Sequence, residues 1–400
     1  MTFSANIEQL KPSATMAVSA LAKRLAAEGR DIINLSAGEP DFDTPAFISD
    51  AAVAGIRAGG TRYTAAPGMP ELRKAIARHL SARSGREIPW EGIVTSTGAK
   101  QALFNAIFSL FGPGDDVLVL KPYWTTYPDL VQIARAEPVF VTGDEARDFK
   151  VTPEDLDGAV TERTRGLILN SPSNPSGAVY SMDELAAIAA WARDRDVWLI
   201  SDEIYRTIYY GSDAVAAPGV LDLDPAGTGR VVLIDGLSKS HAMTGWRFGF
   251  SYSDIELARK MTALQSQITS NPSTPTQSAA LEAYVNEEAS RAAIADMGGA
   301  FRRRRDLVIS RIRELFPEVR LIEPEGAFYV YFRVDSFFDD EVRDATAWCS
   351  RLIEEAGVAL VPGAAFGDDR WARMSYAASD EELLAALDRM AGMVGASAER

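Results

Sequence analysis

The chain has 400 residues, of which 47% are hydrophobic and 24% charged, and its formal net charge is −15. A chain of this length can bury a large core without disulfides or metals. The one cysteine, Cys349, excludes an internal disulfide and suits a reducing cytoplasm. The negative charge disfavours nucleic acid and anionic membranes as partners. No secretory signal and no apolar run of ~18 residues is present, so we expect a cytoplasmic globular protein.

The first ~30 residues predict an arm followed by a helix. From about residue 30, short apolar runs alternate with amphipathic helical stretches, a pattern typical of layered α/β folds. Strands are expected at residues 31–38, 92–98, 116–122, 137–143, 165–172, 197–203, 231–236 and 247–253, with helices at 70–80, 99–111 and 182–194. Several of these strands are continuously apolar, which predicts a mostly parallel sheet covered by helices on both faces.

The pattern changes after about residue 290. A long helix is expected at 289–315, followed by strands at 326–334, 357–363 and 370–377 and a final helix at 381–394. We therefore predict three parts: an arm and helix at 1–30 that pack with the small domain, a large domain at 31–290, and a small α+β domain at 291–400. The arginine run at 302–305 predicts a solvated or dimer-facing helix surface.

Polar residues follow several predicted strands, where ligands bind in open α/β sheets. Gly98, Ala99 and Lys100 lie at a strand-to-helix turn. This turn suits an anion at a helix N-terminus, although an ordinary helix cap is the simpler interpretation. Asp202 and Tyr205 follow an apolar strand, where a carboxylate needs a cation or strong donors. A helix cap explains this pair as well.

Three further positions carry chemical interest. Asn174 and Gly177 lie in a Pro/Asn/Ser/Gly loop that either lines a site or only connects two elements. Arg373 falls within a predicted strand and needs a carboxylate partner, from a substrate or from the chain itself. Lys239, between two serines in SKSHAMTGWR, is a surface charge, a phosphate anchor or a nucleophile.

Metal, nucleotide and histidine chemistry find little support in the sequence. His79 and His241 are far apart and there is no cysteine pair, so we expect no metal site. The motifs GxxxxGK[ST] and GxGxxG are both missing, which argues against nucleoside triphosphates and dinucleotides. His241 lies near Lys239 but has no paired acid nearby in the sequence, so we do not expect it to act as a base.

Taken together, the segments resemble the fold-type I, pyridoxal-phosphate-dependent aminotransferases, specifically the bacterial aspartate and aspartate/prephenate branch of class I. The resemblance covers nearly the whole chain and rests on KPSATMAVSALA, LSAGEPDFDTP, RYTAAPGMPELR, STGAKQALFN, YWTTYP, NSPSNPSGAVY, SDEIY, SKSHAMTGWRFG, EGAFYV and RMSYA. It implies an α/β large domain with a mostly parallel sheet, a smaller α+β domain, pyridoxal 5′-phosphate as cofactor and a homodimer with shared active sites.

The resemblance also implies which residues hold the cofactor. Lys239 would form the Schiff base with the cofactor aldehyde and carry the proton between the substrate Cα and the cofactor. Asp202, ionised at neutral pH, would keep the ring nitrogen cationic. Tyr205 and Asn174 would hydrogen-bond the ring hydroxyl, and Trp124 would stack on the ring. The phosphate would be bound by Gly98, Ala99, Lys100, Ser238 and Arg247, and by Tyr63 of the partner subunit.

A second set of residues would bind the substrate. Arg373 would clamp the α-carboxylate. The partner-subunit arginine that binds the side-chain carboxylate in the best-known members cannot be placed here, which makes Lys100 the candidate for that task. The other implied residues are Gly38, Trp124, Asn174, Lys11 and Thr15, the last two resembling residues of members that also accept prephenate. We expect aspartate or glutamate as donor and a 2-oxo acid such as 2-oxoglutarate as acceptor.

Two alternatives remain at this point. The same fold and cofactor also serve donors such as prephenate or aromatic amino acids, and carbon–sulfur lyases that release pyruvate and ammonia from a sulfur amino acid. A non-enzymatic regulator with an aminotransferase-like domain would need a DNA-binding module, whereas only a short arm precedes the fold here, and the acidic charge opposes DNA binding.

Overall fold

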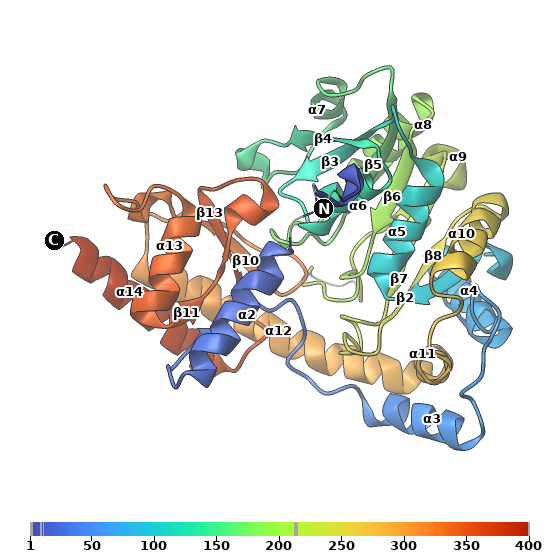
Figure 1. The fold of residues 1–400 in the computed structure, drawn as a ribbon, viewed down its shortest axis with the longest axis horizontal. Helices are drawn as coiled ribbons and strands as arrows, with labels where there is room; N and C mark the ends of the chain where they lie inside the picture. Colours follow the sequence, from blue (N-terminus) through green and yellow to red (C-terminus); the bar gives the residue numbers. More distant parts are fainter. Residues whose placement is uncertain (1–2, 9, 11, 212–214, 399–400) are drawn as a thin grey trace.

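The computed structural model describes residues 3–8, 10, 12–211 and 215–398. A seven-stranded and a four-stranded sheet form two units, which lie on opposite sides of Figure 1 and are linked by the long helix α12 (Glu287–Leu315). In the part of the chain that the structure describes, no helix is both long enough and apolar enough to cross a membrane.

The seven-stranded sheet has the order β2-β8-β7-β6-β5-β3-β4. Its strands are β2 (Ile93–Thr97), β3 (Asp116–Lys121), β4 (Glu137–Thr142), β5 (Thr164–Asn170), β6 (Trp198–Asp202), β7 (Val231–Gly236) and β8 (Phe248–Tyr252). β8 is antiparallel to its neighbours, and the other pairs are parallel. The predicted α/β class with a mostly parallel central sheet is confirmed, and all strands predicted between residues 92 and 253 form.

Helices surround this sheet. They are α3 (Ala46–Arg57), α4 (Pro70–Ser84), α5 (Ala99–Leu110), α6 (Thr126–Ile133), α7 (Pro153–Asp157), α8 (Met182–Asp194), α9 (Pro225–Thr228), α10 (Ile255–Ile268) and α11 (Thr274–Val285), with short helical turns η1 (Trp90–Gly92), η2 (Glu145–Arg147) and η3 (Val220–Asp222).

Apolar side chains of the central strands are buried on both faces of the sheet. In β3, Val117 and Val119 belong to one core cluster with residues of α5 and α6. Leu118, between them, belongs to a second cluster with residues of α8. Leu199 and Ile200 of β6 are divided in the same way. Because successive strand residues point to opposite faces, burial on both sides requires the continuous apolar runs seen in the sequence.

The second unit contains an antiparallel sheet of order β12-β13-β10-β9. Its strands are β9 (Leu321–Ile322), β10 (Tyr329–Arg333), β12 (Val361–Pro362) and β13 (Trp371–Ser375), and its helices are α13 (Ala345–Arg351) and α14 (Asp380–Ala398), with η4 (Asp335–Phe337), the π-helical turn η5 (Leu352–Ala356) and η6 (Gly363–Phe366). The predicted boundaries at residues 30 and 290 stay predictions, and residue 290 lies in the first turn of α12.

The N-terminal segment contacts both units. Its helix α1 (Ala5–Glu8) contacts α6 of the large unit, whereas α2 (Ala14–Ala27) contacts β11 (Val358–Ala359) and β12, and β1 (Ile33–Asn34) pairs in parallel with β11. The strand predicted at 31–38 is therefore shorter than expected and does not join the seven-stranded sheet. The reason is burial, because Ile33 and Leu35 share one core cluster with Val358 and Leu360.

The arginine run on α12 differs from the prediction at one position. Arg304 is only 8% exposed, and its two terminal nitrogens each donate to Asp41 at 2.8 Å. A guanidinium can be buried where a carboxylate pairs with both of its terminal nitrogens. The expectation of a solvated surface is wrong for Arg304, and the ion pair ties α12 to the segment after β1.

Candidate active site

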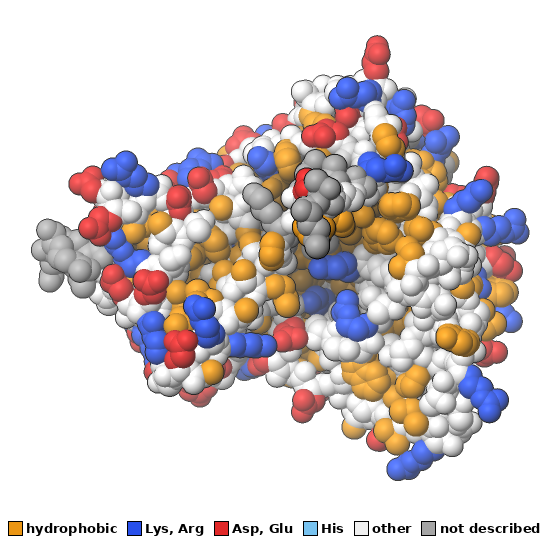
Figure 2. Space-filling view, viewed as in Figure 1, with side chains coloured by type: hydrophobic (Ala, Val, Ile, Leu, Met, Phe, Trp, Pro, Cys, Tyr) orange, Lys and Arg blue, Asp and Glu red, His pale blue; other side chains and the backbone are white. Residues whose placement is uncertain are grey.

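A pocket of about 460 Å³ opens between the two units, at the carboxyl ends of β5 and β6. Figure 2 shows basic side chains gathered in the hollow between the units. The pocket is lined by most of the site residues predicted from the sequence, namely Thr15, Gly38, Ala99, Lys100, Trp124, Asn174, Asp202, Tyr205, Ser238, Lys239, Arg247 and Arg373. These residues come from the N-terminal helix, from loops of the large sheet and from β13, so the fold brings together positions that are far apart in the sequence.

Lys239 follows β7 and projects its amine into the pocket, where Nζ donates a hydrogen bond to the carbonyl oxygen of Gly38. Burial lowers the pKa of the amine from 10.5 to about 8, while the negative charge of Glu39 opposes this shift. Arg373 and Arg247 lower the pKa further. A lysine with this pKa is present partly as the neutral amine near pH 8, which is the form that acts as a nucleophile or base.

Asp202 ends β6 and is 2% exposed. Its Oδ2 accepts a 2.7 Å hydrogen bond from the Tyr127 hydroxyl, and Oδ1 accepts one from the Ile204 backbone N–H at 3.2 Å. Burial raises the pKa of Asp202 from 3.8 to about 6, and the hydrogen bond from Tyr127 is the largest opposing effect. The residues that the structure describes give Asp202 hydrogen-bond donors rather than a salt-bridge partner, so this carboxylate is available to a cationic ligand group.

The hydrogen bond from Tyr127 keeps the pKa of Asp202 lower than burial alone would leave it. We expect Tyr127→Phe to raise the pKa of Asp202 further, because the variant loses a hydrogen bond to the charged form. The acid limb of the pH profile of kcat/KM should move to higher pH, with little change on the alkaline side. A profile measured from pH 5 to 9 tests this, and an unmoved acid limb would refute the role of Tyr127.

Arg373 lies on β13 and is 2% exposed. One terminal nitrogen donates to Asn174 Oδ1 at 2.9 Å and the other to the carbonyl oxygen of Ser36 at 2.7 Å. The guanidinium lies 4.4 Å from the centroid of the Tyr329 ring. Its Nε is buried without a hydrogen-bond partner among the described residues. A buried guanidinium held by neutral acceptors is suited to bind an anionic ligand.

The other end of the pocket forms an anion cradle. Gly98 has φ +83°, and a Cβ at this position would lie 2.5 Å from Nη2 of Arg247. Glycine therefore lets the guanidinium approach the start of α5 at Ala99. The buried Ser238 lines the same pocket. Gly98, Ala99, Ser238 and Arg247 could together hold a phosphate by backbone N–H groups, a hydroxyl and a cation.

Lys100 and Trp124 lie side by side, with Nζ 5.1 Å from the centroid of the indole ring. Burial and the nearby Arg247 lower the pKa of Lys100, whereas Asp129 raises it. Thr15 of α2 lines the pocket, and its hydroxyl is 3.0 Å from that of Ser13.

Of the described residues predicted for the site, Gly98 and Tyr63 are not among those that line the pocket. Lys11 lies outside the described residues. Tyr63 is 90% exposed and does not line the pocket of its own chain. His241, for which no base role was expected, is buried beside Ser240 and does not line the pocket either. Burial lowers the pKa of its imidazole to about 4.

Several pocket residues were not predicted. Tyr329 of β10 shares a 2.8 Å hydrogen bond between its hydroxyl and that of Tyr205. Asn170 ends β5 as Asp202 ends β6, so its strand-end position was a usable signal. Glu39 accepts a 2.9 Å hydrogen bond from Thr244. Other unpredicted lining residues include Ser13, Met16, Ser19, Lys23, Ser36, Leu103 and Tyr127, most of which no local pattern distinguishes.

The sequence profile of the family "Aminotransferase class I and II" matches residues 30–390. The chain belongs to this aminotransferase family. It is 42% identical over 391 residues to an aspartate/prephenate aminotransferase of Cereibacter sphaeroides, with 96% of each chain covered. It is 41% identical over 392 residues to the enzyme of that name from Thermus thermophilus, with 98% of each covered.

Solved structures agree with this assignment. The aminotransferase matches the aspartate aminotransferase from Thermus thermophilus with maleate at a TM-score of 0.92 and 40% identity, covering 98% of this chain and 99% of that one. It matches the aspartate aminotransferase from Rhizobium meliloti at a TM-score of 0.92 and 38% identity, covering 99% of each. The fold is that of the fold-type I pyridoxal-phosphate-dependent transferases, as predicted.

The pocket of the aminotransferase fits pyridoxal 5′-phosphate, the cofactor of this family. An anion cradle at the start of α5, the carboxylate of Asp202 and the amine of Lys239 line one cavity, and within the described part of the chain no cation hydrogen-bonds to Asp202. These groups match the phosphate, the ring nitrogen and the aldehyde of the cofactor. Among the described residues, no group of three or more His, Cys, Asp or Glu side chains could hold a metal ion.

Proposed function

We propose that this pyridoxal-phosphate-dependent aminotransferase moves the amino group of aspartate or glutamate to a 2-oxo acid such as 2-oxoglutarate in two successive half-reactions. The observation that carries the proposal is the placement of Lys239, Asp202 and Arg373 in one pocket. The names of the relatives, aspartate and aspartate/prephenate aminotransferase, support aspartate as the donor. The single buried Cys349 supports the cytoplasm as its location.

When bound, pyridoxal phosphate supplies the aldehyde that accepts the amino group and a ring that withdraws electrons from Cα. We assign the phosphate to the cradle of Gly98, Ala99, Ser238 and Arg247, with Lys100 at its edge. Asp202 would pair with the ring nitrogen and favour its protonated form. Tyr205 and the amide nitrogen of Asn174 would donate to the ring hydroxyl, since Oδ1 of Asn174 already accepts from Arg373. Trp124, which lines the pocket, would stack on one face of the ring.

The chain's own groups then orient the substrate and move its proton. Arg373 binds the α-carboxylate with its terminal nitrogens; Asn174 lies beside the guanidinium, and Gly38 lies beside the amine of Lys239. This orientation fixes Cα relative to the amine of Lys239. The neutral amine takes the proton from Cα, which the lowered pKa of Lys239 makes possible near pH 8.

A donor and acceptor panel tests the proposal. Purified enzyme with aspartate and 2-oxoglutarate should produce oxaloacetate and glutamate in equal amounts. No product from any dicarboxylic pair, with release of pyruvate and ammonia from a sulfur amino acid instead, would show the reaction class to be wrong. Including prephenate as acceptor shows whether the enzyme also accepts this substrate, as the resemblance of Lys11 and Thr15 to residues of prephenate-accepting members suggests.

Lys100 provides a test of side-chain recognition. If its ammonium binds the distal carboxylate, Lys100→Ala should lower kcat/KM for aspartate by about 10- to 100-fold, the range for one hydrogen bond to a charged group. The value for alanine should hardly change. Lys74→Ala is the matched control, because Lys74 also lies over a tryptophan, Trp90, at 5.2 Å. Equal losses for aspartate and alanine would exclude the side-chain role.

We also propose a homodimer in which Tyr63 reaches the phosphate site of the partner subunit. The support is that Tyr63 is exposed and away from the pocket of its own chain. Light scattering gives the oligomeric state. Mixing Tyr63→Ala with Lys239→Ala protein should restore part of the activity if one intact site forms in each mixed dimer.

A further inference from the structure

Residues 144–149, here called the hook, follow β4 and include η2. The hook is closed by a 3.0 Å hydrogen bond from the Phe149 N–H to the Asp144 carbonyl. A Cβ on Gly143 would lie 2.4 Å from the Phe149 carbonyl oxygen, so the base of the hook requires glycine. Asp148 and Phe149 have φ values of +55° and +62°. Such values cost residues other than glycine free energy, and they persist only where surrounding contacts enforce them.

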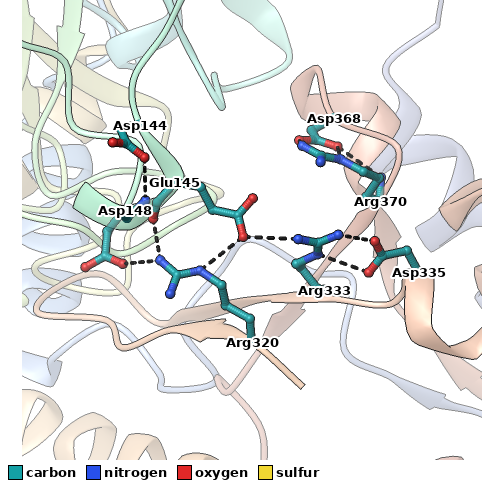
Figure 3. Close-up of polar contacts among 9 residues, drawn as sticks. Asp144, Glu145, Asp148, Arg320, Arg333, Asp335, Asp368 and Arg370 are labelled. Atoms are coloured by element: carbon teal, nitrogen blue, oxygen red, sulfur yellow. Dashed lines mark hydrogen bonds and ion pairs between the residues drawn. The ribbon is translucent and has the colours of Figure 1, made fainter. Parts of the chain in front are cut away.

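The first set of enforcing contacts is ionic and joins the two sheets (Figure 3). Glu145 of the hook points between two arginines of the second unit, with Oε1 3.1 Å from Nε of Arg320 and 3.3 Å from Nη1 of Arg333. Arg320 also donates to the backbone carbonyl of Glu145 and lies 3.5 Å from Asp148. Arg333 is itself held by Asp335. One carboxylate therefore bridges the residue before β9 and the last residue of β10.

The second set is apolar. Phe149 is 7% exposed and belongs to a core cluster whose other buried members come from the second unit. Its ring packs on Trp371 edge to face, with centroids 5.3 Å apart. Trp371 stacks on Tyr331 at 4.9 Å, and Tyr331 is the register partner of Arg373 across β10 and β13. The ring of Phe366, from the same cluster, lies 5.1 Å from the Arg373 guanidinium.

We infer that the hook is a positioning device that sets Arg373 relative to Lys239 and Asp202. The hook belongs to the connection after β4, in the sheet that carries Asp202, while its Glu145 and Phe149 contact the sheet that carries Arg373. Two independent contacts from one strained segment make a rigid joint of the kind that precise orientation of a substrate requires. The inference rests on the proposed role of Arg373 in binding the α-carboxylate.

Phe149→Ala in the cofactor-loaded enzyme should raise KM for aspartate and the Kd of maleate, a non-reacting dicarboxylate, each by at least about fivefold, since small misplacements of a binding group have large effects. The absorbance of the bound cofactor and its pH dependence should stay unchanged, because the Lys239 side of the pocket is intact. Phe149→Leu, which keeps a large apolar side chain, should restore most of the affinity.

Glu145→Gln tests the ionic contact without disturbing the apolar cluster. We expect a KM increase of about two- to threefold, within the range for exposed ion-pair networks. Glu323→Gln is the matched control, because it breaks an exposed pair with Arg313 on the same unit and should leave KM unchanged. A folded Phe149→Ala protein with wild-type KM and wild-type maleate affinity would overturn the inference.

A separate readout distinguishes failure of the hook from failure of the proposed function. If wild-type enzyme does not transaminate aspartate, the proposed function fails, but amide exchange still tests the hook. In Phe149→Ala, amides of β13 should exchange faster while those of β6 keep the wild-type rate. Unchanged exchange in β13 would refute the coupling whatever the substrate is.

Discussion

Lys239→Ala is expected to lower kcat for aspartate by at least about 10⁴-fold, the upper end of the range for a positioned general base. Among the described residues, Lys239 is the only one whose side-chain amine contacts the Gly38 carbonyl. His241 cannot replace it, because burial lowers the pKa of this imidazole and it does not line the pocket. Steady-state rates at pH 8, with absorbance spectra of the bound cofactor, measure the effect.

Two variants separate charge from proton transfer. Lys239→Arg keeps a cation in the pocket but cannot release a proton in the working pH range, so we expect it to be as inactive as Lys239→Ala. Lys260→Ala, at an exposed site on α10, is the control and should keep wild-type turnover. If Lys239→Ala retained about a tenth of the wild-type rate, another group would have to move the proton.

The second large effect is expected for Asp202→Asn. The substitution keeps the size of the side chain but removes the charge, and we expect kcat to fall by about 10²- to 10³-fold, as for the loss of one preorganised electrostatic partner. Asp235→Asn is the control, because Asp235 is not among the residues that line the pocket and its carboxylate accepts a hydrogen bond from the backbone N–H of Gly236. Wild-type turnover in Asp202→Asn would mean that the cofactor ring needs no carboxylate.

The same carboxylate has a second, measurable consequence in the cofactor-free protein. Its folded-state pKa of about 6 lies above its usual 3.8. The folded protein therefore binds more protons than the unfolded chain between these values, and the contribution of Asp202 to stability is lost as the pH rises from about 4 to 6. Urea unfolding at pH 4.5 and 7.5 should show a smaller difference for Asp202→Asn than for the wild type. If the difference in unfolding free energy between the two pH values were the same in Asp202→Asn and the wild type, Asp202 would not be the group with the raised pKa.

The sequence predicted the parts of the fold and site that depend on local pattern. Seven strands of the large sheet were readable because each is a short apolar run, and Asp202 was readable because a carboxylate follows such a run. The pairing of β1 with β11 could not be predicted, because each strand is only two residues long and carries no pattern that identifies a partner far along the chain. The burial of Arg304 depends on Asp41, which the fold brings to α12. The roles of Tyr127, Tyr329 and the hook likewise depend on contacts between residues far apart in the sequence, so no local pattern predicted them.

One structural feature bears on how the chain folds as it leaves the ribosome. Arg373 and its backbone acceptor on Ser36 are separated by 337 residues. The strand β1 likewise cannot pair until β11, far along the chain, has been synthesised. The large sheet contains only residues 93–252 and can form early, because domains fold as units while synthesis continues. The substrate end of the pocket forms last, when almost all of the chain has been made. Chains truncated before β11 should therefore contain the residues of the cofactor cradle and lack the means to hold a dicarboxylate.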